Sequence, residues 1–342
     1  MDLQSLPRRN FITTSAAAAA GMALPFAGRG EAQSSSPKTW SIGCHSRPFT
    51  RFRLSHDDLL DAIKAAGYKS ADMLSIAPPA ARNAAPMAGG APPSAAQRGR
   101  GAVAVTPEMV SALKEKLVSR GLVSTVCGLS IQTSVPLADA ITAARQQITN
   151  AHALGQKYAL YLGLESEAQY IQATKVLADA AAFGKERGVR VAIKQHHGLN
   201  NTGGELVGWV RQVNHPNFGI FHDPGNVIYY TAKDPVAQLE IVGPYTIGVV
   251  AKDCLGPHFQ EREAGAPSFG SSVPDPRGDE VMIQFGTGKV DFAGLFKKLK
   301  SFGFNGPIFV EGTAVGDTAE NTIANARANR EYLEKAIAGG GA

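Results

Sequence analysis

The chain has 342 residues, of which 44% are hydrophobic. It contains no stretch of the roughly 20 consecutive apolar residues that are needed to cross a bilayer, so we expect no membrane span. Its formal net charge is +5, but residues 1–33 and 79–105 carry most of the excess arginine and leave a nearly neutral body. Such a body lacks the broad basic surface that binds nucleic acid, and we expect no nucleic-acid partner.

Residues 1–33 have the composition of a targeting segment. The stretch 7–12 reads PRRNFI, a twin-arginine signature, and the small-residue apolar stretch 16–27 follows it. A chance arginine pair before an alanine-rich helix would give the same pattern. We expect a twin-arginine signal peptide and export to the periplasm, and we exclude this segment from the fold.

Strand-like and helix-like segments alternate along the body. We expect strands at 40–44, 68–76, 122–129, 158–162, 189–194, 218–222, 246–252 and 308–310, and helices at 57–66, 106–120, 137–154, 167–187, 205–213, near 236, 292–302 and 319–336. Buried strands separated by helices indicate a parallel sheet. Eight such units predict an α/β fold, a single-domain (β/α)8 TIM barrel over 38–337. No glycine-rich fingerprint supports the competing doubly wound sheet.

Two segments interrupt this alternation. Residues 77–105 are almost all Ala, Pro, Gly and Arg, and such a segment cannot bury enough apolar area to offset its ordering entropy. We expect a disordered, low-complexity insertion there, after the second strand. Residues 254–280 form a long loop after the seventh strand, and both a lid and a passive excursion stay open.

Several predicted strands end abruptly in polar side chains. Lys194 ends the fifth strand, Asp223 follows the sixth, and Glu311 follows the eighth. In a barrel of parallel strands the carboxyl ends form the floor of one pocket. We therefore expect these three side chains to converge. His196 shares a strand face with Lys194, so both point inward if either does.

The order and spacing of short motifs resemble those of the xylose isomerase-like TIM barrels grouped as the sugar phosphate isomerase/epimerase family. The motifs are QHHG at 195–198, DPGN at 223–226, KD at 252–253, GTGKVDF at 286–292 and VEG at 310–312. The resemblance covers about residues 38–337. It implies a sugar-processing barrel in a broad family that also includes dehydratases, lyases and an endonuclease branch.

The resemblance also implies one divalent metal (Mn, Co, Zn or Mg) at the barrel mouth, held by residues of the last four strands. Asp223 and Glu311 match two of the usual ligand positions, but Lys194 and Val250 stand at the other two. An ammonium group has no lone pair and valine has no ligand atom. Two carboxylates alone hold a transition metal poorly.

Three interpretations of this site stay open. His196 could complete a metal site with Asp223 and Glu311. Alternatively, Lys194 and Lys252 could replace the metal as fixed positive charges. In the third interpretation the site is catalytically silent and the protein only binds sugar.

Proton removal next to a carbonyl group needs a base and an electropositive partner. Glu311 and Asp223 are the candidate bases, and Lys194, His196 and Lys252 are the electropositive candidates. As plainer alternatives, Asp223 could cap the turn at Pro224, and Lys252 could pair with Asp253. The candidate substrate contacts are His45, His197, Asn226 and Lys252.

These residues predict a sugar isomerase or epimerase that acts on a carbohydrate or keto-sugar. The first alternative is a lyase or hydratase of 3-keto-glycosides, and the second is a catalytically silent sugar-binding barrel. An endonuclease is disfavoured, because that branch needs additional His and carboxylate ligands. The expected partner is a small-molecule carbohydrate, and a homo-oligomer stays open.

Overall fold

The computed structural model describes residues 40–78, 104–163, 167–257 and 281–339. The body Lys38–Ala342 is one compact unit. The predicted signal segment 1–33, nearly all of the predicted insertion 77–105 and most of the loop 254–280 lie outside the described residues.

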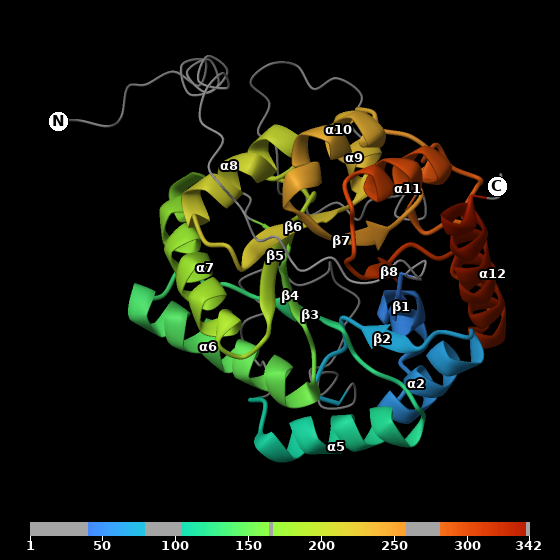
Figure 1. Cartoon of the computed structure of the whole chain (residues 1–342). Helices are drawn as coiled ribbons and strands as arrows, with labels where there is room; N and C mark the ends of the chain where they lie inside the picture. The colour runs from blue at the N-terminus through green and yellow to red at the C-terminus, as the bar shows by residue number, and fades with distance from the viewer. Residues whose placement is uncertain (1–39, 79–103, 164–166, 258–280, 340–342) are drawn as a thin grey trace, which may run out of the picture. The chain divides into compact units, whose positions relative to one another are not determined.

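The described residues form one eight-stranded sheet in which every neighbouring pair of strands is parallel (Figure 1). The strands are β1 (Ile42–His45), β2 (Ser70–Asp72), β3 (Val126–Leu129), β4 (Tyr158–Tyr161), β5 (Arg190–Lys194), β6 (Phe218–His222), β7 (Thr246–Ala251) and β8 (Ile308–Val310). Their order around the sheet is β2-β1-β8-β7-β6-β5-β4-β3. The predicted (β/α)8 barrel is confirmed.

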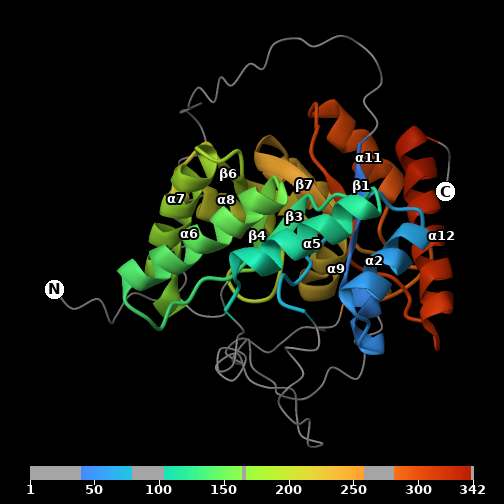
Figure 2. The same ribbon diagram turned by 90° about the horizontal axis from the view of Figure 1, so that it is seen from below.

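Helices surround the strands in Figure 1, and Figure 2 shows α5 and α6 lying across one side of the barrel. The helices are α2 (His56–Ala65), α5 (Pro107–Ser119), α6 (Leu137–Leu154), α7 (Tyr170–Lys185), α8 (Gly203–Val213), α9 (Pro224–Thr231), α10 (Pro235–Val242), α11 (Phe292–Ser301) and α12 (Ala319–Ala338). Within the described ranges, no helix is both long and apolar enough to span a membrane.

Local capping explains where two of the helices begin. The Ser55 side chain accepts a hydrogen bond from the amide of Asp58 at the start of α2. Thr106 does the same for Met109 at the start of α5, where Pro107 occupies the first turn. Both are standard ways to satisfy the free amides of a first turn.

A buried carboxyl group helps to close the barrel between β2 and β3. An isolated parallel bridge joins Ser70 of β2 to Val123, which lies three residues before β3. Oδ1 of Asp72 accepts hydrogen bonds from the amides of Thr125 at 2.7 Å and Val126 at 2.9 Å. Burial raises the pKa of Asp72 to about 6, against the opposing effect of these amides.

Both strands are shorter than the predicted 68–76 and 122–129. β2 ends before Met73, whose φ of 54° is left-handed. The amides of Thr125 and Val126, before and at the start of β3, bond to the Asp72 side chain rather than to the main chain of β2. Gly43 on β1 faces the same carboxyl group, where an added Cβ would collide with Oδ2 of Asp72. That position therefore requires glycine.

The barrel interior is a small apolar cluster below the strand ends. It consists of Val126, Leu160, Ala192, Phe221, Ile247, Val250 and Phe309, all buried. Alternate residues of a strand share a face. Polar residues two positions after members of this cluster therefore point inward as well, at the carboxyl end of the barrel: Lys194, Asp223, Lys252 and Glu311.

Candidate active site

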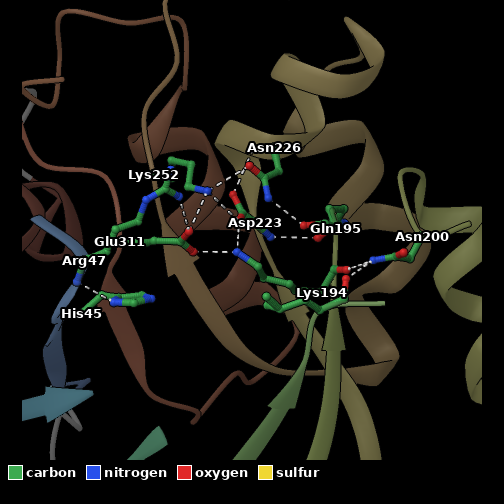
Figure 3. A network of polar contacts seen from close by, with 10 residues as sticks. His45, Arg47, Lys194, Gln195, Asn200, Asp223, Asn226, Lys252 and Glu311 are labelled. Carbon is green, nitrogen blue, oxygen red and sulfur yellow. Dashed lines mark hydrogen bonds and ion pairs between the residues drawn. The ribbon is translucent and has the colours of Figure 1, made fainter. Parts of the chain in front are cut away.

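Three residues from separate strands meet in one buried cluster, as expected from the strand ends (Figure 3). Nζ of Lys194 lies 2.9 Å from Oδ2 of Asp223 and 2.6 Å from Oε2 of Glu311. The side chains of Lys194 and Asp223 are 1% and 0% exposed, and that of Glu311 is 8% exposed. The lysine ammonium therefore joins two carboxylates in a site from which water is almost excluded.

Two further cations contact the same carboxylate of Glu311. Nζ of Lys252, at the end of β7, lies 3.1 Å from Oε1 of Glu311 and 2.9 Å from Oδ1 of Asn226. Nη1 of Arg47 lies 3.1 Å from the same Oε1, and its side chain is 47% exposed. Arg47 opens the short 3-10 helix Arg47–Phe52 directly after β1. Sequence reasoning missed it, although it follows a strand end by two residues.

The surroundings shift the pKa values of the two lysines in opposite directions. Burial opposes the charge of Lys194, but Asp223 and Glu311 outweigh it and raise its pKa above the ordinary value. Burial prevails at Lys252 and lowers its pKa despite the same two carboxylates. Lys194 is therefore a fixed cation, and Lys252 gives up a proton more readily.

The carboxylate of Glu311 is held ionised. Burial alone would raise its pKa, but the cations Lys194, Lys252 and Arg47 together hold it well below the usual range. Opposite charges within a few ångströms favour the ionised form of a carboxyl group. Glu311 is therefore an acceptor without a proton at neutral pH.

Two of the three histidines predicted to lie near the site, His45 and His196, stay neutral there. Burial lowers the pKa of His45 to about 3, and burial followed by Lys194 lowers that of His196 well below its ordinary value. The ring of His196 packs against those of His197 and Tyr230. Tyr230, in α9, was not singled out from the sequence, and burial raises its pKa to about 12.

Asp223 both caps a helix and pairs with Lys194. Its Oδ1 accepts a hydrogen bond from the amide of Asn226 and so caps α9, a helix where the sequence predicted only a turn. Its Oδ2 faces Lys194. The Asp-Pro pair fits a helix start as well as a turn, because proline is favoured in the first turn.

Gln195 fixes the positions of Asp223 and Asn226 through hydrogen bonds. It was not singled out from the sequence. Its Oε1 accepts from the amide of Asp223 at 2.8 Å, and its main-chain oxygen accepts from Nδ2 of Asn226 at 2.8 Å. Its Nε2 lies 3.1 Å from Nδ1 of His222. The candidate contact Asn226 is thus fixed between Gln195 and Lys252.

The alternative that Lys252 pairs with Asp253 is wrong. Neighbouring residues at a strand end point in opposite directions. Asp253 accepts hydrogen bonds from the amides of Cys254, Gly286, Gly288 and Val290, at 2.8 to 3.1 Å. It therefore organises the turn before α11, and Lys252 contacts Glu311 and Asn226 instead.

The residues present do not fit a divalent metal. The described ranges contain no group of three His, Cys, Asp or Glu side chains that could hold a metal ion, so Asp223, Glu311 and His196 do not form a ligand set. The ammonium group of Lys194 stands between the two carboxylates, and Val250 is a fully buried part of the barrel interior. Neither side chain can donate to a metal.

Comparisons with known proteins agree with this fold. A family model described as xylose isomerase-like TIM barrel matches residues 60–336. A search of curated proteins gives no match.

Among solved structures, the chain is similar to a xylose isomerase domain protein from Planctomyces limnophilus, with 18% identity, a TM-score of 0.59 and coverage of 88% of this chain and 99% of that one. The D-allulose 3-epimerase from Methylomonas sp. shares 17% identity, with a TM-score of 0.58 and the same coverage. The probable 3-DHS dehydratase AsbF from Bacillus anthracis shares 14%, with a TM-score of 0.57 and coverage of 86% and 98%.

Proposed function

Because the chain belongs to the xylose isomerase-like TIM barrel family, we propose that it isomerises or epimerises a carbohydrate by removing a proton next to a carbonyl group. The observation that carries the proposal is the ionised carboxylate of Glu311 at the barrel mouth, in contact with Lys194, Lys252 and Arg47. Sugar epimerases among the similar structures support this class of reaction.

Glu311 is the base in this proposal, and Asp223 is not. Asp223 is fully buried, and its Oδ1 caps α9, so its carboxylate is tied to the fold. Glu311 is slightly exposed. It stays ionised at neutral pH, so it has a free proton-accepting form, and an enediolate held by the neighbouring cations offsets its low basicity.

The lysines take over the electrostatic work that a metal does elsewhere in the family. A fixed positive charge near a developing enediolate stabilises it without rearranging during the reaction. Lys194 is buried and held in place by two carboxylates. Lys252, with its lowered pKa, is the second cation beside the reacting carboxylate.

The second candidate function is a lyase or hydratase that acts on 3-keto-glycosides. A dehydratase among the similar structures favours it, and elimination starts with the same proton abstraction. If the predicted export segment 1–33 acts as a twin-arginine signal, the protein meets free sugars or glycosides in the periplasm, which suits either candidate.

The test uses the mature protein in D₂O with ketohexoses and with 3-keto-glycosides, and NMR follows deuterium entering the carbon next to the carbonyl. We expect exchange, and we expect Glu311→Gln to slow it by at least ~100-fold, the usual contribution of a general base. Glu331→Gln is the control, because this surface carboxylate contacts Arg330 and lies in α12.

The products separate the candidates. A rearranged sugar indicates an isomerase or epimerase, whereas an unsaturated keto product with release of the aglycone indicates a lyase. A parent protein that binds the sugar but exchanges no proton would contradict both and favour a silent binding barrel.

A further inference from the structure

His45 points into the barrel mouth from the side opposite β5 and β6. It ends β1, and its ring centroid lies 6.0 Å from that of Phe309, a member of the interior cluster. Its neighbour Cys44 faces the outer core instead. Figure 3 shows the imidazole of His45 below Glu311, pointing into the polar network.

A main-chain contact decides which nitrogen of His45 carries the proton. The amide nitrogen of Arg47 donates a hydrogen bond to Nδ1 of His45 at 2.8 Å. A backbone amide can only donate, so Nδ1 must present its lone pair. In the neutral ring the proton is therefore on Nε2.

The surroundings keep the ring neutral. Beyond burial, which has the largest effect, four charged groups act on His45: Glu311 from β8, Lys194 from β5, Lys252 from β7 and Arg47. One is an anion and three are cations, so a further positive charge is unfavourable.

The Nε2 proton is available to a ligand. Nζ of Lys194 already donates to two carboxylates, and Nζ of Lys252 to Asn226 and Glu311. Among the described residues, His45 makes one ring hydrogen bond, through Nδ1, and none is found from Nε2. The ring thus offers an N–H donor at the mouth that neighbouring side chains have not taken.

We propose that His45 is a catalytic residue, a neutral imidazole whose Nε2–H donates a hydrogen bond to the carbonyl oxygen of the bound sugar. The inference rests on the proposed function. In the step, the carboxylate of Glu311 takes the proton from the neighbouring carbon. The electrons of that C–H bond form the carbon–carbon double bond, and those of the carbonyl π bond move onto oxygen. The proton of His45 stays on Nε2 throughout and stabilises the oxyanion.

The first test does not depend on turnover. In protein labelled with ¹⁵N-histidine, the two-bond correlation pattern of His45, assigned by its loss in His45→Phe, should show a proton on Nε2 and none on Nδ1 from pH 5 to 8. A ketohexose should then shift the Nε2–H resonance. A proton on Nδ1, an imidazolium ring in this range, or an unchanged Nε2–H at saturating sugar would overturn the inference.

The second test separates donation from proton transfer. Glutamine can place an amide N–H near the Nε2 position but cannot act as an acid or base at neutral pH. We expect His45→Phe to lower the rate of proton exchange by about 100- to 1000-fold, as loss of one preorganised donor does. His45→Gln should recover most of that loss and leave the pH profile unchanged.

The results distinguish the inference from the proposed function. If His45→Gln and His45→Phe lower the exchange rate equally and one limb of the pH profile disappears, His45 transfers a proton. The inference then fails, while the proposed enzymatic function is unaffected. If no sugar is turned over but a ketose shifts the Nε2–H resonance, the proposed reaction fails, while the donor role of His45 toward a sugar oxygen is supported.

Discussion

The ammonium group of Lys194 lies 2.6 Å from the carboxylate of Glu311, in the place where related barrels are expected to hold a metal ion. The pair is buried, and among the described residues its charges are compensated by each other and by Asp223, Lys252 and Arg47. Removing one member of a buried ionic cluster leaves an uncompensated charge in a medium of low dielectric constant. The site and the stability of the barrel therefore depend on the same contacts.

Lys194→Met should destabilise the protein strongly. The substitution keeps a long apolar stem but leaves Asp223 and Glu311 facing each other, and we expect the free energy of unfolding to fall by about 3–5 kcal/mol at pH 7. Urea unfolding measures the change. The deficit should shrink toward pH 4, because protonating one carboxylate removes the repulsion.

Arg145→Met provides the matched control for that variant. Arg145 forms a pair with Asp179 at 2.7 Å, but the two side chains are 48% and 23% exposed. Exposed pairs contribute about 0–1 kcal/mol, so the control should lose no more than that. Equal losses in the two variants would contradict the buried, uncompensated-charge explanation.

Glu311 should give the protein an acid-sensitive stability. Its pKa in the folded state lies well below its usual value, so its contribution is present above the unfolded-state pKa of about 4.3 and is lost as the pH falls further. Glu311→Gln should flatten the loss of stability below about pH 4. Urea unfolding from pH 7 to pH 3 tests this, and an unchanged acid slope would contradict it.

Asp72 should behave in the opposite way. Its pKa rises to about 6 in the folded state, so ionisation is less favourable there than in the unfolded chain. Its contribution is therefore fully present below about pH 4 and is lost as the pH rises through about 6. Asp72→Asn keeps a carbonyl oxygen for Thr125 and Val126, and we expect it to gain about 1–3 kcal/mol at pH 8 and nothing at pH 4.

Asp72→Ala is the control for this prediction. It removes the acceptor and leaves two buried amides without a partner, which costs about 1–3 kcal/mol for each amide. It should therefore destabilise the protein at both pH values. A loss of stability in Asp72→Asn at pH 8 would show that the carboxylate itself is needed between β2 and β3.

The alternation of strands and helices was enough to predict the barrel, and strand periodicity was enough to bring Lys194, Asp223 and Glu311 together. The ends of most predicted elements lie within three residues of those observed. Both signals are local: a period of two sets the inward face, and parallel strands bring their carboxyl ends to one side. Lys252 became a candidate through the family motif that contains it.

What the sequence could not supply is the identity of partners distant in the chain. The sequence suggests Asp253 as the ionic partner of Lys252. However, three of the four hydrogen bonds that Asp253 accepts come from amides 33–37 residues away. The side chain of Asp72 accepts from two amides more than 50 residues later in the chain. Gln195 acts through Asp223, on the next strand of the sheet. Strand and helix periodicity do not predict such long-range hydrogen bonds.

Asp253→Ala should loosen the turn before α11 without unfolding the barrel. Four amides lose their acceptor, those of Cys254, Gly286, Gly288 and Val290. Hydrogen exchange followed by mass spectrometry should show faster exchange over 284–292, while β4 to β6 stay protected. Asp253→Asn, which keeps one oxygen, should give a smaller effect. Unchanged exchange over 284–292 would contradict the assigned role.

The lysine-assisted site should not depend on a divalent metal. We expect activity and melting temperature to survive dialysis against EDTA, and added Mn²⁺, Co²⁺, Zn²⁺ or Mg²⁺ to change neither. The reason is the donor set: Lys194 and Val250 contribute no ligand atom where the family usually has an acid and a histidine. Activity lost with EDTA and restored by one of these ions would contradict this expectation.

The double variant Lys194→Glu, Val250→His should create the metal site that the parent lacks. With Asp223 and Glu311 it offers four ligands from four adjacent strands, β5 to β8, which is the number of protein ligands in a closed zinc site. Isothermal titration should detect stoichiometric binding to the double variant and none to the parent. Lys194→Gln, Val250→Ala is the control, since it removes the ammonium group without adding a carboxylate or an imidazole. Binding by the control equal to that of the double variant would mean that the ammonium group of Lys194 alone had kept the metal out.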